Sequence, residues 1–274
     1  KMLPKLGIIA GGGWLPRQLA KHCKQSGRPV FVIVLRDQAD LDDFTSVPNA
    51  AYRIGAAGGM IKRLRAEGAE DLVFAGSVRK PPLSALRPDL WSANFLMRST
   101  VFSKGDDTLL RAVISALESE GFRVVGADDV LPDILAPSGC ISRTAPSDSH
   151  MCDIQVGELA AKALGAEDKG QAVVAKDGVA VAQEDRRGTA AMLNDLAVSG
   201  HHSEAIGGVL VKVTKPAQDR RVDLPAIGCE TIEQAKAAGL AGIAVSAGGA
   251  ILLDREAIVA AADQAGLFVI GIDA

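Results

Sequence analysis

The opening of the chain most constrains its fold, because a short apolar run leads through three glycines into a helical repeat. Residues 6–10 form a strand-like run, and Gly11, Gly12 and Gly13 follow it directly. Apolar residues then recur at helical spacing through residues 15–23. This order predicts a buried strand, a tight turn and a helix.

The same alternation continues along the first half of the chain. Apolar runs at 30–35 and 72–75 predict two further buried strands, and residues 60–67 predict a helix between them. Residues 108–120 carry leucine and valine at helical spacing, behind two aspartates that suit a helix start. Strands that alternate with helices favour a parallel sheet covered by helices. We therefore expect an α/β protein whose N-terminal domain is a Rossmann-like parallel sheet.

Proline, glycine and serine interrupt the pattern around residues 131–148, which predicts a domain boundary. We expect an N-terminal domain over 1–133, a linker over 134–147 and a C-terminal mixed α/β domain over 148–274. A chain of 274 residues is long enough for two ordinary domains. Two such domains commonly leave a cleft where ligands bind, so we expect the ligand cleft between them.

The C-terminal domain is expected to begin with antiparallel pairing. Two strand-like runs, 172–175 and 179–182, flank Asp177-Gly178, which is a strong hairpin turn signal. Further strands are predicted at 209–213, 243–245, 251–253 and 268–272, and further helices at 189–197, 232–238 and 255–265. A hairpin followed by alternating elements predicts a mixed α/β domain.

Charge and cysteine content exclude several classes of protein. The formal net charge of -3 provides no long-range attraction to nucleic acid, so local lysines and arginines must hold any anionic ligand. The four cysteines include no C-x-x-C pair, which argues against a zinc ribbon or a disulfide framework. The chain shows neither a cleavable signal segment nor an apolar stretch near ~20 residues, so we expect a cytoplasmic protein.

The glycine turn is a candidate phosphate site. It follows the first predicted strand, so its backbone N–H groups and the next helix N-terminus are placed to receive phosphate. A tight turn between strand and helix explains the same glycines without a ligand. Pro16 stands where a dinucleotide-binding motif has its third glycine, and Arg36 follows the second strand. An NADP-type interpretation therefore stays open beside the phosphate one.

Two aspartates, Asp106 and Asp107, precede the helix predicted at 108–120, with Lys104 and Arg111 on either side of them. Aspartate at a helix start is ordinary capping chemistry, which contributes ~1 kcal/mol. Arg111 lies in the first turn, where the positive end of the helix dipole disfavours its charge. A negative charge from Asp107 or from a ligand phosphate would offset this unfavourable interaction. Capping and substrate binding both remain interpretations of this segment.

The stretch 207–228 is the richest in candidate ligands. Its cations suit phosphate charge: Lys212, Lys215, Arg220 and Arg221. Asp219 and Asp223 suit Mg²⁺ or Mn²⁺, which neutralise phosphate oxygens and activate water. On a strand, aspartates four apart lie about 13 Å from each other, too far to share one ion. We therefore predict Asp223 as the catalytic carboxylate, with Asp219 as its support or as a salt-bridge partner. A solvated loop of paired charges is the alternative.

Residues 90–97 place Trp91 and Phe95 four apart, with Arg87 and Arg98 on either side. An amphipathic helix of this kind suits contact with an acyl chain or a membrane surface. Core packing explains the same spacing equally well. Peripheral membrane contact is therefore an expectation that needs a structure.

Several motifs, in order along the chain, resemble one family. They are Gly7-Ile-Ile-Ala-Gly-Gly-Gly13, Phe74-Ala-Gly-Ser-Val78, Lys104-Gly-Asp-Asp107, Gly170-Gln-Ala-Val-Val174, Gly207-Gly-Val-Leu-Val-Lys-Val213, Arg221-Val-Asp-Leu-Pro225, Gly239-Leu-Ala-Gly-Ile243 and Ala262-Asp-Gln-Ala-Gly-Leu-Phe268. With these motifs the chain resembles the UDP-2,3-diacylglucosamine pyrophosphatases of the LpxI type. The resemblance covers nearly the whole chain, and such an ordered set is more specific than any single motif.

The resemblance implies Mg²⁺-dependent hydrolysis of UDP-2,3-diacylglucosamine, with Mn²⁺ as the alternative ion. The products would be UMP and 2,3-diacylglucosamine 1-phosphate, a step in lipid A biosynthesis. Asp223, in Arg-Val-Asp-Leu-Pro, corresponds to the family's catalytic aspartate and is the expected metal ligand. The expected substrate ligands are Gly11, Gly12, Gly13, Lys104, Asp106, Asp107, Arg111, Gly188, Thr189, Lys212, Lys215, Gln218 and Arg221. We also expect a homodimer that has no nucleic-acid partner.

The chain departs from the family pattern at three positions. Where the family is expected to read Glu-Gly-Thr-Asp, this chain has Arg187 and Ala190 at the two acidic places. Ser246 replaces a third expected acid. Because these departures remove acids from any wider carboxylate cluster, a non-catalytic nucleotide-sugar or lipid carrier stays open as an alternative. An NADP-binding oxidoreductase is the other alternative.

Overall fold

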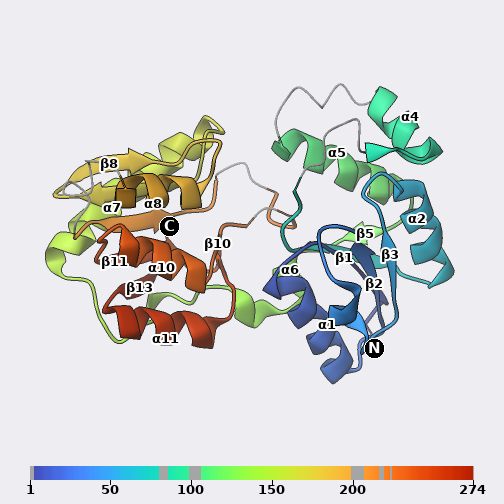
Figure 1. The fold of residues 1–274 in the computed structure, drawn as a ribbon, viewed down its shortest axis with the longest axis horizontal. Coiled ribbons are helices and arrows are strands. Elements are labelled where there is room, and N and C mark those ends of the chain that lie inside the picture. The colour runs from blue at the N-terminus through green and yellow to red at the C-terminus, as the bar shows by residue number, and fades with distance from the viewer. Residues whose placement is uncertain are drawn as a thin grey trace. The chain divides into compact units, whose positions relative to one another are not determined.

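The computed structural model describes residues 3–79, 86–98, 106–198, 207–215, 219–222 and 224–273, with the backbone alone at 106 and 107. Two units emerge from the contacts along this chain (Figure 1). The N-terminal unit comprises Lys1–Pro132 together with Asp219–Asp223. The C-terminal unit comprises Asp133–Gln218 and Leu224–Ala274. Both units are α/β, as the sequence predicts.

The N-terminal unit is built on a five-stranded parallel sheet. Its strands are β1 (Leu6–Ala10), β2 (Val30–Leu35), β3 (Asn49–Tyr52), β4 (Asp71–Ala75) and β5 (Arg123–Val124), in the order β3-β2-β1-β4-β5. Every pair in this sheet is parallel. Strand order reverses at β1, which is the Rossmann arrangement and confirms the predicted fold of this unit. Such a reversal opens the carboxyl edge of the sheet beside β1 and β4, where the glycine turn lies.

Helices cover both faces of this sheet, because the central strands β1, β2 and β4 are buried along almost their whole length. The helices are α1 (Trp14–Ser26), α2 (Ala57–Ala66), α4 (Leu90–Arg98), α5 (Asp106–Ser119) and the short α6 (Ala127–Val130), with a 3-10 turn η1 at Leu41–Phe44. One face packs Phe31, Ile33 and Leu72 against apolar residues of α2 and α5. Helix α1 contacts β1 and β2 through its buried face, which includes Leu15 and Leu19.

The C-terminal unit has a mixed six-stranded sheet, as predicted. Its strands are β6 (Gly139–Cys140), β7 (Ala172–Lys176), β8 (Val179–Gln183), β9 (Val209–Lys212), β11 (Gly242–Ser246) and β13 (Phe268–Ile272), in the order β6-β13-β11-β9-β7-β8. The predicted hairpin is confirmed, because β7 and β8 pair antiparallel across Asp177 and Gly178, both with positive φ. A separate two-stranded sheet joins β10 (Ala226–Ile227) to β12 (Ile251–Leu252).

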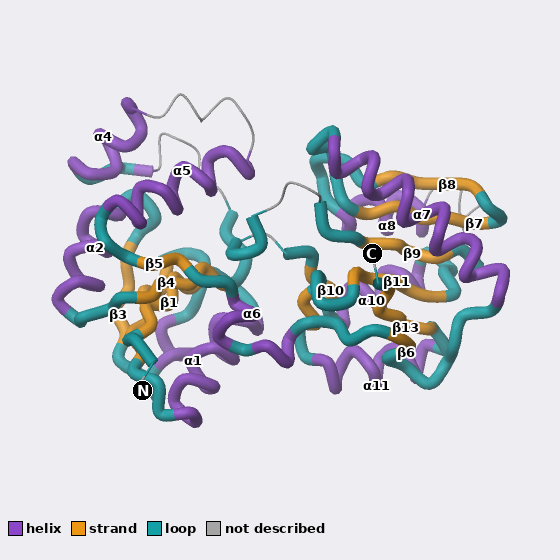
Figure 2. The backbone as a smooth tube through the Cα atoms, turned by 180° about the vertical axis from the view of Figure 1, so that it is seen from behind, coloured by secondary structure: helices purple, strands orange, loops and turns teal. Residues whose placement is uncertain are grey.

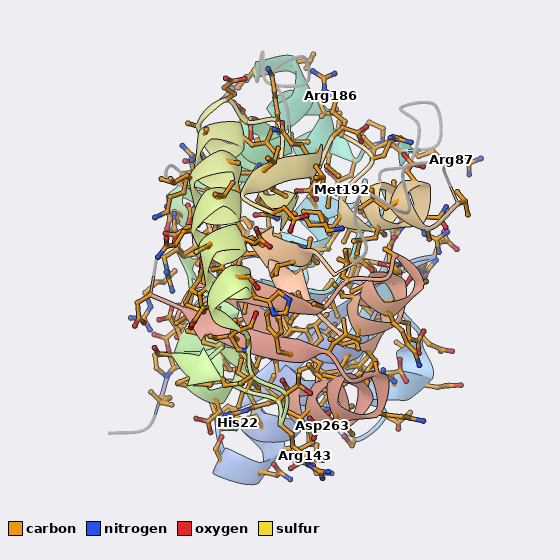
Figure 3. The ribbon with its side chains drawn as sticks, turned by 90° about the vertical axis from the view of Figure 1, so that its left-hand side faces the viewer. His22, Arg87, Arg143, Arg186, Met192 and Asp263 are labelled. Atoms are coloured by element: carbon orange, nitrogen blue, oxygen red, sulfur yellow. The ribbon has the colours of Figure 1, made fainter. Side chains whose placement is uncertain are left out.

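In the part of this unit that the structure describes, three helices cover one face of the sheet and one covers the other. Helices α8 (Thr189–Val198), α10 (Cys229–Ala237) and α11 (Arg255–Ala265) share a core with one face of the sheet (Figure 1). Helix α7 (Asp148–Ala166) packs on the opposite face, across β7, β8 and β9 (Figure 2). Beside α11, the Arg143 backbone N–H and guanidinium both contact Asp263, which anchors the segment after β6 (Figure 3).

Helix α7 is the largest element that the sequence analysis does not predict. Its buried face includes Asp153 and Gly157, so the apolar repeat in the sequence is weak. Gly157 lies so close to β9 that an added Cβ would meet the Val211 side chain at 2.5 Å. The helix therefore gains its stability from close packing on the sheet, which a search for apolar periodicity does not detect.

Candidate functional site

A polar pocket of about 300 Å³ lies in the C-terminal unit. Its lining comes from the end of β8, the start of α8, the end of β9 and the start of α10. The lining residues are Glu184, Arg187, Gly188, Thr189, Ala190, Lys212, Glu230, Thr231 and Gln234. A cavity of this size falls at the lower end of the range for small-molecule sites.

Two helix N-termini contribute to this pocket, because Thr189 begins α8 and Thr231 lies in the first turn of α10. The first turn of a helix presents backbone N–H groups and carries a partial positive charge. Gly188 turns the chain from β8 into α8 with φ of 89°, and its N–H donates to the Asp185 carbonyl at 2.9 Å. The two helix starts favour an anionic group such as phosphate in this pocket, while Glu184 and Glu230 add negative charge to the same lining.

Lys212 adds a full positive charge to the pocket. It is the last residue of β9, and its Nζ donates to the Ala226 carbonyl oxygen at 3.1 Å. A carboxylate lies in the same lining, because Glu184 is only 9% exposed. Its Oε1 accepts from Thr189 Oγ1 at 2.7 Å, and its Oε2 accepts from the Gln171 N–H at 2.6 Å. Glu184 is thus held in place by two donors and fixes the start of α8.

Arg187 lines the rim of the pocket between two carboxylates. Its Nη2 is 2.9 Å from Asp185 Oδ2 and 2.8 Å from Asp195 Oδ2. Hydrogen bonds to Asp185, which have the larger effect, and to Asp195 raise the pKa of the Arg187 guanidinium. The hydrogen bonds from Arg187 in turn lower the pKa of Asp185. Arg187, which stands where the resemblance leads us to expect an acid, therefore forms ion pairs with Asp185 and Asp195.

The structure brings Gly188, Thr189 and Lys212 together in one pocket, although Lys212 lies 23 positions after Thr189. Sequence reasoning did not select Glu184, Glu230, Thr231 or Gln234 as site residues. A lone glutamate and one ordinary helix start carry no motif, so only the fold reveals them. Ser246, which also stands where the resemblance leads us to expect an acid, is buried and accepts a hydrogen bond from the Thr214 N–H at 3.1 Å.

The glycine turn of the N-terminal unit is closed by its own backbone. The Gly11 N–H donates to the Ala75 carbonyl, and Gly12 exchanges two hydrogen bonds with Ser77, all at 2.8 to 2.9 Å. A Cβ on Gly11 would meet the Ser77 carbonyl oxygen at 2.4 Å. Close approach of the segment after β4 therefore explains Gly11, while a Cβ on Gly12 would meet the Gln38 carbonyl oxygen at 2.7 Å. The N–H groups of both glycines are used in the contact with the segment after β4. Gly13, with φ of 99°, is the N-cap of α1.

Lys215 and Arg221, both predicted to bind phosphate, form ion pairs with acids. Lys215 Nζ lies 2.9 Å from Asp168 Oδ1 in the C-terminal unit. Arg221 belongs to the N-terminal unit, where its Nη1 lies 2.6 Å from Glu118 Oε1 and its Nη2 lies 2.7 Å from Asp219 Oδ2. Arg221 is therefore held by two carboxylates, of which Asp219 is the salt-bridge partner that the sequence suggests.

Several predicted residues lie outside the described part of the chain. They are Lys104, Gln218 and Asp223, and at Asp106 and Asp107 the structure describes the first residues of α5 without their side chains. Arg111 lies on α5, and its charge lowers the pKa of Asp219 in addition to the larger effect of Arg221. Among the described residues, no three His, Cys, Asp or Glu side chains form a group that could hold a metal ion. No described helix is both long enough and apolar enough to span a membrane.

Two family models match adjoining parts of the chain. The one described as the LpxI N-terminal domain matches residues 5–134, and the one described as the LpxI C-terminal domain matches residues 137–270. A protein of Caulobacter vibrioides named UDP-2,3-diacylglucosamine pyrophosphatase LpxI is 44% identical over 277 residues. The match covers 98% of this chain and 98% of that protein.

Solved structures share much less with the chain. The precorrin-6A reductase CobK is 14% identical, with a TM-score of 0.32 over 98% of this chain and 87% of that one. The UDP-glucose 4-epimerase of Thermus thermophilus is also 14% identical, with a TM-score of 0.32 over 98% and 86%. Likenesses as distant as these carry no argument about function.

Proposed function

Because the chain belongs to the LpxI family over nearly its whole length, we propose that it is a UDP-2,3-diacylglucosamine pyrophosphatase. It hydrolyses the pyrophosphate bond of this acylated nucleotide sugar to UMP and 2,3-diacylglucosamine 1-phosphate, in lipid A biosynthesis. The observation that carries the proposal is the 44% identity to the Caulobacter protein across 98% of both chains. Identity of this extent includes both units rather than one shared domain.

The pocket of the C-terminal unit supports an anionic ligand. Lys212 and the first turns of α8 and α10 favour a phosphoryl group electrostatically. Charged donors that are fixed before the substrate arrives stabilise charge that develops during phosphoryl transfer. We therefore propose that Thr189 and Lys212 bind one phosphoryl group of the substrate, beside the turn at Gly188, whose own N–H is bonded to the Asp185 carbonyl. In this proposal Thr189 contributes its backbone, since its hydroxyl is bonded to Glu184.

We further propose Asp223 as the catalytic carboxylate and Mg²⁺, or Mn²⁺, as the cofactor. A divalent ion would neutralise phosphoryl oxygens and favour attack by water. The nearest carboxylate in the chain, Asp219, has both oxygens bonded to Arg221, so it is poorly suited to a metal. The metal proposal therefore depends on Asp223.

The test of the proposed function is product analysis. Purified protein is incubated with UDP-2,3-diacylglucosamine and Mg²⁺, and UMP and the acylated sugar phosphate are measured by chromatography. Both products should appear in equal amounts, and EDTA should stop their release. Asp223→Ala should abolish release and still retain the substrate. Protein that binds the substrate and releases no UMP would instead be a carrier.

Lys212 provides a second test of the same proposal. We expect Lys212→Met to weaken substrate binding roughly 10- to 100-fold, because a charge-assisted contact to phosphate is lost. Lys236→Met is the matched control, since Lys236 is exposed at the end of α10, away from the pocket lining. Equal affinity for the two variants would remove the pocket from the proposed site.

An NADP-binding oxidoreductase is the second candidate, and the strand order β3-β2-β1-β4-β5 is the observation that favours it. The closed glycine turn argues against it, because the Gly11 and Gly12 N–H groups already donate to backbone carbonyls. A titration with NADPH, followed by its fluorescence, separates the candidates. A reductase should bind NADPH tightly, whereas a pyrophosphatase should not.

The homodimer, the cytoplasmic location and the peripheral membrane contact stay proposals.

Helix α4 supports membrane contact, because Leu90 and Met97 are seven residues apart and 87% and 77% exposed. Trp91 and Phe95, by contrast, stack on each other at 5.6 Å between ring centroids, and the Trp91 indole N–H donates to Glu120. Sedimentation with anionic vesicles, for the protein and for Leu90→Ser with Met97→Ser, would test this contact.

A further inference from the structure

The segment immediately before Asp223 is held by the N-terminal unit, although it lies between β9 and β10 of the C-terminal unit. The chain leaves the C-terminal unit after Gln218 and returns to it at Leu224. Within this excursion, Val222 packs against the apolar core that α2 and α5 share with the sheet of the N-terminal unit. A short segment with one apolar side chain needs further contacts to stay in one place.

Arg221 provides the strongest of those contacts. Its Nε and Nη2 donate to the two carboxylate oxygens of Asp219 at 2.9 and 2.7 Å, while its Nη1 donates to Glu118 at 2.6 Å. A planar guanidinium that bonds two carboxylates in this way has its fork geometry fully specified. Arg220 adds a looser contact, 3.7 Å from Asp128.

The backbone of the segment is folded by the same acid. The Arg221 N–H donates to Asp219 Oδ1 at 3.1 Å, and the Val222 N–H donates to the Asp219 carbonyl at 3.1 Å. Asp219 therefore shapes the turn, and Glu118 fastens it to α5. These two carboxylates thereby engage three of the five guanidinium N–H donors of Arg221.

We propose that Glu118 and Asp219 are positioning residues, which act through Arg221 to hold the chain before Asp223 on the N-terminal unit. Arg221 is then an anchor of this segment rather than a ligand of the pyrophosphate. The inference rests on the proposed function, because it assumes that Asp223 carries the reaction. A carboxylate that follows an anchored turn loses less conformational entropy when it reaches its reactive position.

Arg221 as a phosphate ligand and Arg221 as an anchor predict different kinetics, so measurements can distinguish the two roles. If Arg221 bound phosphate, loss of a competing carboxylate would strengthen substrate binding and lower KM. If Arg221 is an anchor, loss of either carboxylate loosens the turn and lowers kcat with little change in KM. Glu118→Gln is the most informative variant, because it keeps the size of the side chain and Glu118 is 42% exposed.

We expect Glu118→Gln to lower kcat roughly 10- to 100-fold, the loss that a displacement of about 1 Å causes in a catalytic group. KM should stay within about threefold of the parent. Arg221→Lys, which keeps the charge and loses the fork, should fall between the parent and Arg221→Gln in kcat. Glu256→Gln, an exposed glutamate of α11, is the matched control and should leave kcat and KM unchanged.

Amide hydrogen exchange of the intact protein provides a readout that does not need activity. The N–H groups of Arg221 and Val222 should exchange at least tenfold faster in Glu118→Gln and at the parent rate in Glu256→Gln. Unchanged exchange at both residues would overturn the anchor. A lower KM with unchanged kcat would overturn it too, in favour of a phosphate ligand. Failure of the parent to release UMP would sink the proposed function alone, since exchange would still report the anchor.

Discussion

Arg28 Nη2 lies 2.6 Å from Asp71 Oδ2 at the amino end of β4, with the two side chains only 8% and 3% exposed. Asp71 also accepts hydrogen bonds at 2.7 and 2.8 Å from Arg123, the first residue of β5. One buried carboxylate therefore connects the end of the α1 region to two strands. These contacts lie at the end of the sheet where β4 and β5 begin, which is opposite to the end where the glycine turn lies.

Removal of this charge should strongly destabilise the N-terminal unit. We expect Asp71→Asn to lower the free energy of unfolding by about 3–5 kcal/mol, because Arg28 would keep a buried charge without its partner. Trp14 and Trp91, the two tryptophans of the chain, both lie in this unit, so their fluorescence during urea unfolding reports on it. Asp43→Asn is the control, since its ion pair with Arg17 is 3.6 Å long and exposed, worth at most about 1 kcal/mol.

The glycine turn leads to a second prediction. Gly11→Ala should destabilise the N-terminal unit by about 1–3 kcal/mol, because the new Cβ would meet the Ser77 carbonyl at 2.4 Å, where neither backbone yields easily. Gly59→Ala, inside α2, should be neutral or stabilising, since its Cβ would only reach van der Waals contact with Tyr52 at 3.4 Å. The same fluorescence measurement compares them. Equal stability of the two variants would mean that the turn tolerates a side chain.

A third prediction concerns the hydroxyl of Thr189. Thr189→Val keeps the shape of the side chain and leaves Glu184, which is 9% exposed, with one hydrogen bond fewer. We expect a loss of about 1–3 kcal/mol in the stability of the C-terminal unit, measured by calorimetry. Thr189→Ser keeps the donor and should recover most of that loss. If the valine variant were as stable as the parent, the hydrogen bond from Thr189 to Glu184 would contribute nothing to stability.

The Asp219 turn should respond to acid. Hydrogen bonds from Arg221 hold the pKa of Asp219 below its ordinary 3.8. A lowered carboxyl pKa means that its contribution to docking is complete above pH 3.8 and is lost as pH falls through the lower, folded-state pKa. Amide protection at Arg221 and Val222, corrected for intrinsic exchange rates, should therefore be constant from about pH 6 to about pH 4 and collapse below it. In Asp219→Asn protection should be weaker throughout this range, and a parent-like acid transition in this variant would assign the effect to another group.

Much of the fold follows from local pattern. Strands β1, β2 and β13 and helix α11 have the predicted bounds, because continuous apolar runs and sharp glycine or aspartate signals mark their ends. Strands β3 and β5 were not predicted. They are short and lie toward the edges of the sheet, so their stability comes from pairing with a neighbour rather than from their own residues.

The sequence by itself determined the α/β class, the two units, the hairpin and the family, since each depends on local periodicity or on motifs read in order. Only the tertiary structure decided what the polar residues do. It brings Thr189 and Lys212 into one pocket, directs the N–H groups of Gly11 and Gly12 to backbone carbonyls, and pairs Arg221 with Glu118, 103 positions away. Charge and hydrogen bonding depend on distance in space and on burial, and neither can be read from residue order.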